Sequence, residues 1–356
     1  MKFRKLLFFG ALLFCCGKVT AQDKLKKLDT WLADNAEILG GRDILLIYKD
    51  GKIIYSHSED KMLPRQKMLQ RYIALKKGET ADLDSYTPTS RQPIASCSKW
   101  LSAALVMTFV DEGKLRLNDT VGKYLPVLTA HGKGNITIAE CLSHQTGIDE
   151  PKLKQEIQDI HDLSSMDDAI AHIAEMPMDG KPGKVFHYSN AGLQIAAAVI
   201  EKISGKNFET LFQERIAKPL KMINTDFGNN KVPVAAGSAV STPADYINFL
   251  TMILNKGTFN GKRILSEKSI AEMQVNRLTP DVKIAYTPAQ IDNFGYGYGE
   301  WVMGDGFISS PGLFGSFPWV DNKNHYCAFL MTYYINTQGR DQRMLDLKTL
   351  VDEAIK

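Results

Sequence analysis

Strand-like sequence stands at both ends of this chain and helical sequence fills the middle, and this order restricts the fold more than any other feature. Residues 43–58 (DILLIYKDGKIIYSHS) form two β-rich runs joined at Asp50-Gly51, a dipeptide typical of tight hairpin turns. Strand-like sequence returns at residues 294–308, where glycines recur, and at residues 325–334. The strands at the two ends can pair with each other only if the helical middle leaves the sheet as an insertion.

The helical middle carries two clear start signals. Thr137 and Glu140 fit a capping box in TIAECLSH, and Thr242-Pro243 supply a cap and a first-turn proline. Further helices are expected at residues 190–204 and 207–217, and an amphipathic helix at 342–355 ends the chain.

The simplest assembly of these elements is a mixed α/β fold with one antiparallel sheet. We expect the sheet part at about 22–95 and 290–356, and a mostly helical part at about 96–289. Two parts joined in this way leave a cleft between them, which is where a small-molecule site is expected.

Residues 1–21 are interpreted as an export signal, which places the protein in the periplasm or outside the cell. MKFRK is basic, LLFFGALLFCC is apolar, and the small residues VTA precede Gln22 as a cleavage site. The apolar run is about half the roughly 20 residues that a spanning helix needs, and no later segment is long and apolar enough. A lipid anchor on Cys15 or Cys16 is the less favoured alternative.

Charge and cysteine content argue against several classes of function. The signal removes four of the 43 basic residues and none of the 40 acidic ones, so the mature chain has a net charge near −1 and no electrostatic case for binding nucleic acid. Cys97, Cys141 and Cys327 are an odd number without CxxC spacing, which argues against a disulfide framework or structural zinc and leaves a single bridge open. We expect no metal and no cofactor.

The SxxK pattern, a serine three residues before a lysine, occurs twice. Ser58 to Lys61 lies in a charged stretch after the hairpin and is interpreted as surface. Ser96 and Lys99 instead begin an apolar helical run, so they fall on one helix face one turn apart. By itself the pair could be an N-cap and a surface lysine. Alternatively, a desolvated lysine with a lowered pKa could take the proton of the serine hydroxyl at the positive end of the helix dipole.

A second pattern, YxN, has one occurrence in a suitable position. Tyr188 and Asn190 follow the turn at Lys181-Pro182-Gly183 and directly precede a helical run. A tyrosine hydroxyl there can relay a proton, and an asparagine amide can orient a lysine or bind a substrate amide. A cap with a packed aromatic ring is the alternative interpretation.

Together these stretches resemble the serine β-lactamase and penicillin-binding-protein superfamily, in its branch of class C β-lactamases, DD-peptidases and esterases. The resemblance covers nearly the whole mature chain, in the family's order. It includes VDEGKLRLNDTVGKYLP (110–126), NITIAECLSHQTGI (135–148), KPGKVFHYSNAGLQ (181–194), STPADYINFLTMILNKGTFNGKRILS (241–266) and GLFGSFPWVD (312–321). The resemblance implies that Ser96 is the acylated nucleophile, Lys99 its base, Tyr188 the second proton-transfer residue and Asn190 its polar companion.

The third motif of this family departs from the pattern here. The family has lysine or histidine, then Thr-Gly or a similar pair, where this chain has Ser310-Pro311-Gly312. Ser310 brings no positive charge for a substrate carboxylate, whereas Gly312 keeps room for close approach, and the Leu313 amide could join the Ser96 amide in an oxyanion hole. An anchor worth about 1.5 to 3 kcal/mol is lost.

We therefore expect an exported serine hydrolase that cleaves an ester or amide through an acyl-enzyme on Ser96. DD-peptidase and β-lactamase activities on peptidoglycan or β-lactams rank after it, because the missing base matters most for substrates with a carboxylate. Lys323 or Arg340 could compensate if the fold brings either near. A non-catalytic penicillin-binding or sensor protein on the same fold is the alternative from another class. His144 and His187 are expected to be structural.

Overall fold

The structure is a computed structural model, and it describes the chain except for residues 1–20, 79, 151–162, 229, 289–293 and 305. The export signal and the alternative lipid anchor on Cys15 or Cys16 lie outside the described residues. No described helix is long and apolar enough to cross a membrane.

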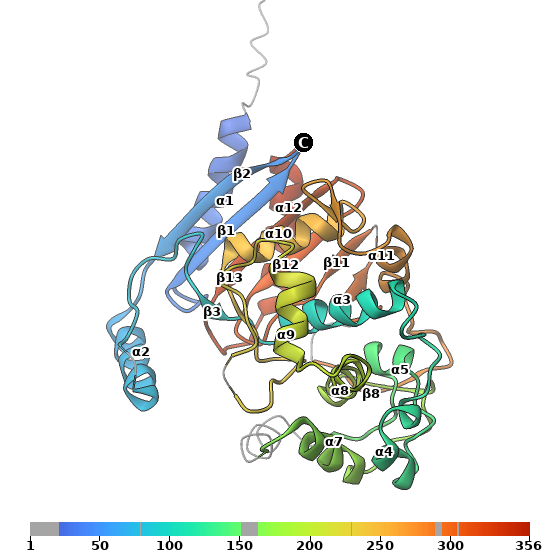
Figure 1. Cartoon of the computed structure of the whole chain (residues 1–356). Helices are drawn as coiled ribbons and strands as arrows, with labels where there is room; N and C mark the ends of the chain where they lie inside the picture. Colours follow the sequence, from blue (N-terminus) through green and yellow to red (C-terminus); the bar gives the residue numbers. More distant parts are fainter. Residues whose placement is uncertain (1–20, 79, 151–162, 229, 289–293, 305) are drawn as a thin grey trace, which may run out of the picture.

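One antiparallel sheet organises the molecule, and its strands come from both ends of the chain (Figure 1). Its strands, in spatial order, are β2 (Lys52–Asp60), β1 (Arg42–Lys49), β13 (Tyr326–Thr332), β12 (Phe317–Asp321), β11 (Phe307–Ser309), β10 (Trp301–Met303) and β9 (Gly295–Tyr296). The hairpin at Asp50-Gly51 joins β1 to β2, and β1 pairs with β13. The predicted mixed α/β fold, with a sheet built from both termini, is confirmed.

Side chains of β1 alternate between two cores, as the period of two in a strand requires. Leu45 and Ile47 pack with the helices of the two termini, α1 (Ala21–Asn35) and α12 (Arg340–Ala354). Ile44 and Leu46 join the larger core on the other face, together with α3 (Cys97–Asp111) and α10 (Pro243–Leu254). Because α10 lies against β1, β12 and β13, the central helices do not form a separate body.

The remaining helices and short strand pairs surround α3. The helices are η1 (Val121–Lys123), α4 (Pro126–Ala130), α5 (Ile138–Leu142), α7 (Met166–Glu175), α8 (Ala191–Ser204), α9 (Phe208–Phe212), η2 (Gln213–Ala217) and α11 (Glu267–Met273). The short strands are β3 (Gln92–Pro93) with β5 (Val240–Ser241), β4 (Val185–His187) with β8 (Lys283–Tyr286), and β6 (Thr258–Phe259) with β7 (Lys262–Arg263).

Both predicted helix starts are confirmed. Thr137 and Glu140 form a capping box at α5, and the Thr242 side chain accepts a hydrogen bond from the Asp245 amide at the start of α10. The expected helix at 207–217 changes to wider π turns after residue 212.

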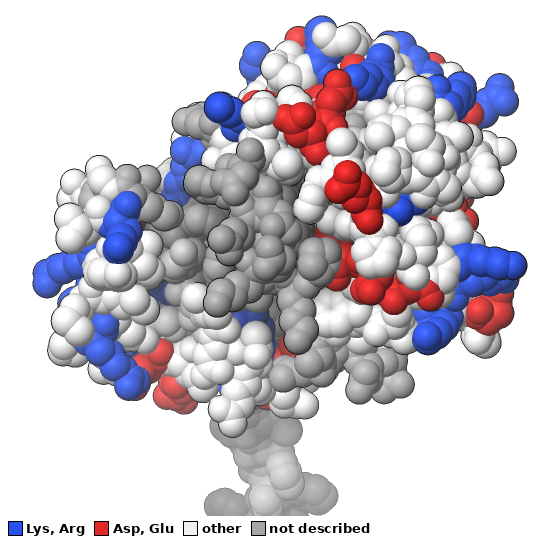
Figure 2. Space-filling model, turned by 90° about the horizontal axis from the view of Figure 1, so that it is seen from below, with Lys and Arg blue, Asp and Glu red and all other residues white. Residues whose placement is uncertain are grey.

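Two helices in the first hundred residues were not predicted. α1 packs on α12, and α2 (Pro64–Lys77) lies in a stretch for which the sequence analysis predicted no helix or strand. Figure 1 shows α2 projecting at the left from the rest of the molecule. Elsewhere the surface is mixed in charge, and Figure 2 shows basic and acidic side chains on the same face.

Candidate active site

Ser96 sits at the start of the buried helix α3, where the chain makes a sharp turn. The preceding residue, Ala95, has a φ of +45°, which is unusual for a residue with a Cβ. The turn is held by the Ser98 hydroxyl, which donates to the Ala95 carbonyl at 2.6 Å and accepts from the Ala239 amide at 3.0 Å. Ser96 is therefore presented at the positive end of the helix dipole by a turn that other residues fix.

Lys99 lies one turn along α3 and is 2% exposed. Its Nζ donates to Ser96 Oγ at 3.3 Å, to Asn190 Oδ1 at 2.9 Å and to the Ala236 carbonyl at 3.0 Å. Burial together with three specific acceptors is not the arrangement of a surface lysine. The Ala236 carbonyl was not foreseen from the sequence, because a backbone acceptor has no side-chain signature.

Tyr188 is packed beside the same amine. Lys99 Nζ lies 4.8 Å from the centroid of its ring, and Trp301 stacks on that ring at 5.3 Å between centroids. Burial raises the pKa of the Tyr188 hydroxyl, and a hydrogen bond with Ser96 acts in the opposite direction. The hydroxyl is therefore held in its neutral form next to Ser96, where it can both donate and accept a proton.

The loop between β4 and α8 brings Asn190 to the same place. Asn190 precedes the first residue of α8, and its side-chain oxygen accepts from Lys99, while its backbone amide donates to the Glu150 carboxylate at 2.6 Å. The two patterns singled out in the sequence, SxxK and YxN, thus meet although about 90 residues separate them in the chain.

The segment 310–313 runs along the other side of Ser96. The Ser310 hydroxyl lies 3.2 Å from both the Ser96 carbonyl and the Gly299 carbonyl, and it serves to join these segments. A Cβ on Gly312 would come within 2.3 Å of the Ile94 carbonyl. The space at Gly312 is therefore required by the chain leading into Ser96, and the sequence had suggested only that substrate needs it.

Leu313 follows in a turn, and its carbonyl accepts a hydrogen bond of 2.8 Å from Arg340 Nη1. Arg340 is 7% exposed and also donates to the carbonyls of Tyr334 and Asn336. Of the two cations that could replace the missing base, Arg340 therefore lies beside the third motif, whereas Lys323 is exposed between β12 and β13.

His144 lies directly behind Tyr188, with 4.6 Å between ring centroids. Its Nδ1 accepts from the Ser189 amide at 3.3 Å, and its Nε2 pairs with the Tyr296 hydroxyl at 2.9 Å. Burial, with the nearby charge of Lys99, holds the pKa of the His144 imidazole well below its usual range. A neutral imidazole that is fully engaged in this way supports Tyr188 and fits the structural role expected for it.

Glu300 is a residue that the sequence analysis missed. It is fully buried, and neither carboxyl oxygen has a hydrogen-bond partner among the described residues. Burial raises the pKa of the Glu300 carboxyl well above its ordinary value, which favours the neutral acid in the folded protein. It directly follows Gly299, whose carbonyl contacts the Ser310 hydroxyl. Glu300 therefore lies close to the segment 310–313, which we call the strand side of the site.

Side chains of types that can bind a metal ion meet around His187. Its Nδ1 lies 2.5 Å from Asp179 Oδ2 and 3.9 Å from Asp149 Oδ1. Among the described residues, this group of three has a geometry that could admit a metal ion. However, a hydrogen bond between His187 and the Asp179 carboxylate is enough to explain why these side chains lie together. Cys97, Cys141 and Cys327 are buried free thiols, so the disulfide left open by the sequence is not formed among them.

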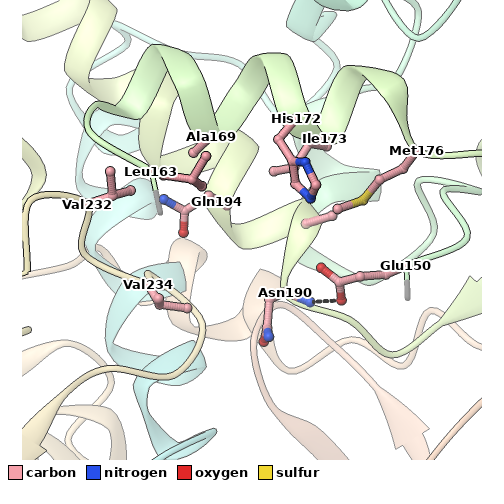
Figure 3. Close-up of a pocket in the computed structure, with 11 residues that line it drawn as sticks. Glu150, Leu163, Ala169, His172, Ile173, Met176, Asn190, Gln194, Val232 and Val234 are labelled. Atoms are coloured by element: carbon pink, nitrogen blue, oxygen red, sulfur yellow. Dashed lines mark hydrogen bonds between the residues drawn. The ribbon is translucent and has the colours of Figure 1, made fainter. Parts of the chain in front are cut away.

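A narrow pocket adjoins Asn190 (Figure 3). Figure 3 shows His172 of α7 and Met176, which directly follows α7, above it, and the Glu150 carboxylate bonded to the Asn190 amide. Besides Gln194, its other lining side chains are apolar: Leu163, Ala169, Ile173, Ala191, Val232 and Val234. The apolar lining therefore adjoins Asn190, the residue that accepts a hydrogen bond from Lys99.

The family model for β-lactamases matches residues 32–356, which is almost all of the described chain. With the antiparallel sheet and its inserted helices, this defines the class: the protein belongs to the β-lactamase family, within the serine β-lactamase and penicillin-binding-protein superfamily of hydrolases.

Individual relatives differ in what they do. A β-lactamase-type protein from Bacteroides dorei DSM 17855 is 24% identical, with a TM-score of 0.76 and coverage of 93% of this chain and 98% of that one. EstCE1, described as a hydrolase with promiscuous acyltransferase activity, is 19% identical, with a TM-score of 0.72 and coverage of 93% and 99%. At these identities the two structures establish the fold alone.

A curated relative named for its reaction is the teichoic acid D-alanine hydrolase of Staphylococcus aureus. It is 28% identical over 141 residues, which are 40% of this chain and 34% of that protein. The alignments with an uncharacterised Mycobacterium tuberculosis protein and with this hydrolase span 64% and 34% of those proteins. The chain thus spans less than two thirds of these relatives.

Proposed function

We propose that this protein is an exported serine hydrolase that cleaves an ester or amide bond through an acyl-enzyme on Ser96. The observation that carries the proposal is the position of Lys99, whose buried Nζ lies 3.3 Å from Ser96 Oγ and is held by Asn190 and the Ala236 carbonyl. A nucleophile and a base within hydrogen-bond reach, with the base oriented by further groups, is the arrangement that covalent acyl transfer requires.

In the acylation step, Ser96 Oγ attacks the substrate carbonyl carbon and gives its proton to Lys99, which acts as a neutral amine at this step, or passes it through the Tyr188 hydroxyl, which releases its own proton in exchange. The carbonyl oxygen becomes an oxyanion, which the backbone amides of Ser96 and Leu313 would stabilise. This role is supported by the contacts of segment 310–313 with the turn before Ser96.

The leaving group then needs a proton, and Tyr188 would supply it. Its neutral hydroxyl is bonded to Ser96, so a proton taken from Oγ can pass to the departing oxygen or nitrogen without leaving the site. Water attacks the acyl-enzyme by the reverse sequence, which restores Ser96 and releases the acid.

An uncharged substrate agrees best with the surroundings of Ser96. Ser310 carries no charge, and the pocket beside Asn190 is largely apolar. An ester with a short aliphatic acyl group needs no anchor for a carboxylate. The fold shared with EstCE1 is compatible with this assignment.

A second candidate, the hydrolysis of a substrate that bears a carboxylate, is favoured by Arg340. The guanidinium donates to the Leu313 carbonyl, next to the segment where the family has its base. A D-alanyl carboxylate, of the kind named for the Staphylococcus aureus relative, could be attracted by this charge. The candidates differ in substrate and share the chemistry at Ser96.

The proposal is tested with Ser96→Ala and, as a matched control, Ser58→Ala in the other SxxK. Turnover of p-nitrophenyl butyrate, with intact mass recorded in parallel, should vanish in Ser96→Ala and persist in Ser58→Ala. Full activity in Ser96→Ala would exclude the mechanism. A stable penicillin adduct on the wild type without turnover of any ester would instead support a non-catalytic penicillin-binding protein.

A further inference from the structure

The helix α2 presents apolar side chains to solvent. Met68 is 69% exposed, Leu69 55%, Tyr72 57% and Leu75 76%. Surface helices normally turn such residues inward. In α2 the half-buried positions are Gln66, Lys67, Gln70 and Ile73, and Ala74 is the buried member.

The exposed side chains have an ordered arrangement around the helix. With 100° per residue, Met68, Tyr72 and Leu75 fall on one stripe, because they are spaced by four and three residues. Arg71 borders this stripe on one side, and Arg65 borders it on the other. The solvent-facing side of α2 is thus an apolar stripe with basic edges.

The charge of this segment is of one sign. Residues 61–78 contain six lysines and arginines and no acidic residue, in a chain whose positive and negative charges are otherwise nearly equal. The nearest ion pair, between Arg65 and Glu37, is long at 3.8 Å and exposed at both ends. The segment therefore keeps a strong positive charge that an anionic partner would complement.

The outward direction of the stripe is fixed by the contacts of its inner side. Gln66 donates to the Glu37 carbonyl at 3.0 Å and accepts from the Leu63 amide at 2.7 Å. Pro64 begins the helix, and Gly78, in the left-handed conformation, ends it. Rolling the apolar stripe inward would break the Gln66 contacts.

We propose that α2 is a membrane-surface helix, which binds the protein to an anionic phospholipid bilayer. An apolar stripe between basic edges is what a helix lying in the headgroup region needs, with the stripe in the acyl boundary and the bases at the phosphates. A tyrosine in the stripe suits this interface. A second copy of the chain is a poorer partner, because its own basic edges would repel those of the first.

The binding is peripheral and independent of the reaction at Ser96. No described helix could span a bilayer, and α2 would lie along the surface. Such docking would keep a hydrolase close to substrates made or anchored at the membrane.

The experiment places an environment-sensitive NBD label at position 75. Leu75→Cys is made in a full-length chain with Cys15→Ser and Cys16→Ser, and the buried native thiols Cys97, Cys141 and Cys327 stay unlabelled. Vesicles of phosphatidylcholine with phosphatidylglycerol should blue-shift and raise the emission, and vesicles of phosphatidylcholine alone should do so far less. The same label at Ile223, which is 86% exposed and lies outside α2, is the matched control and should not respond.

Charge variants measure the electrostatic part. Arg65→Gln and Arg71→Gln should each weaken vesicle binding roughly fivefold, as expected for a base close to an anionic surface. Met68→Ser with Tyr72→Ser should abolish the response at position 75. Hydrolysis of a soluble ester and the unfolding temperature should stay unchanged in all four substitutions, which shows that the fold is intact.

Three outcomes would overturn the proposal. A label at position 75 that ignores anionic vesicles shows that α2 does not enter the bilayer, even if the N-terminal apolar run holds the chain there. Equal responses at positions 75 and 223 show unspecific adsorption. A dimer in sedimentation velocity that Met68→Ser with Tyr72→Ser dissociates assigns the stripe to an interface between two copies.

Discussion

The two sides of the site treat buried polar groups differently. On the helix side, formed by Ser96, Lys99, Tyr188 and Asn190, the Lys99 Nζ is hydrogen-bonded to Ser96 Oγ, Asn190 Oδ1 and the Ala236 carbonyl. On the strand side, Glu300 buries a carboxyl group that has no partner among the described residues, and Ser310 is a neutral group used to join backbone segments. The contacts of the helix side thus converge on the proposed base. On the strand side, the group next to Ser96 is the neutral Ser310, burial raises the pKa of the Glu300 carboxyl, and the charge of Arg340 is bonded to backbone carbonyls.

This difference suggests which steps each side controls. The Lys99 amine is held by fixed hydrogen-bond partners and is therefore preorganised for proton transfer. Its loss should reduce the rate for every substrate. A neutral side selects among substrates, so changes there should act on one substrate more than on another. Substitutions on the two sides can therefore separate chemistry from specificity.

Replacing Lys99 on the helix side should have the largest effect on activity. Lys99→Met removes the base and leaves the Asn190 oxygen and the Ala236 carbonyl without their shared donor, so kcat for ester and amide substrates should fall about 10²- to 10⁴-fold. The matched control is Lys61→Met in the surface SxxK, which should keep full activity. Stopped-flow and steady-state rates with p-nitrophenyl butyrate measure both variants. A Lys99→Met protein that still acylates at the wild-type rate would show that Tyr188 suffices as the base.

Replacing the cation behind the strand side should have a smaller and selective effect. Arg340→Met should lower kcat/KM for a D-alanyl-D-alanine peptide relative to p-nitrophenyl butyrate by roughly tenfold, since a charge-assisted hydrogen bond contributes about 1.5 kcal/mol or more. The ratio of the two substrates is the readout, because a loss of folding would lower both values together. Lys323→Met, on the exposed turn, is the control. An unchanged ratio would give Arg340 only the role of tying Leu313, Tyr334 and Asn336 together.

The helix side could be predicted from the sequence because its side chains belong to short local patterns. The spacing of Ser96 and Lys99 places both on one helix face, and a turn followed by a helix places Tyr188 and Asn190 at a loop tip. The meeting of the two patterns needed the family resemblance, because no local rule specifies a contact over 90 residues. The Ala236 carbonyl that completes the Lys99 network could not be found from residue types.

The strand side was harder to predict because its residues act through the backbone and through tertiary contacts. Ser310 and Gly312 were found by alignment with the family, but their contacts with Ser96 and Ile94 depend on the sheet. Glu300 stands in an apolar, aromatic run that was interpreted only as strand. An acidic residue within such a run was the sequence signal that could have indicated a buried carboxyl group.

The helices α1 and α2 were missed in the sequence analysis for different reasons. α1 does carry a helical pattern, with Leu25, Leu28 and Leu32 at suitable spacing, so the signal was present. α2 has its apolar residues on the outside, so a search for an inward apolar face could not find it. It forms because Pro64 suits a first turn and because leucine, glutamine, lysine, arginine and alanine are good helix formers.

Replacing Glu300, the buried acid of the strand side, should have the smallest effect on activity. Its effect on stability should depend on pH. Glu300→Gln substitutes a neutral side chain of the same shape for a neutral acid, so kcat/KM near pH 7 should stay close to that of the wild type. The folded protein holds the Glu300 proton because burial raises the pKa of this carboxyl, whereas the unfolded chain loses it above its ordinary pKa of about 4.5. The folded state then binds more protons, so the stability contribution is complete below about pH 4.5 and is lost as the pH rises.

Thermal unfolding of both proteins across this range tests the assignment. The wild type should lose stability more steeply than Glu300→Gln as the pH rises, while the exposed control Glu175→Gln should follow the wild type. Asp43, whose pKa burial raises to about 8, contributes a slope of the same sign in all three proteins and therefore cancels from the comparison. Parallel curves for the wild type and Glu300→Gln would mean that Glu300 is ionised in the folded protein, and the strand side would then hold a charge that repels a substrate carboxylate and opposes Arg340.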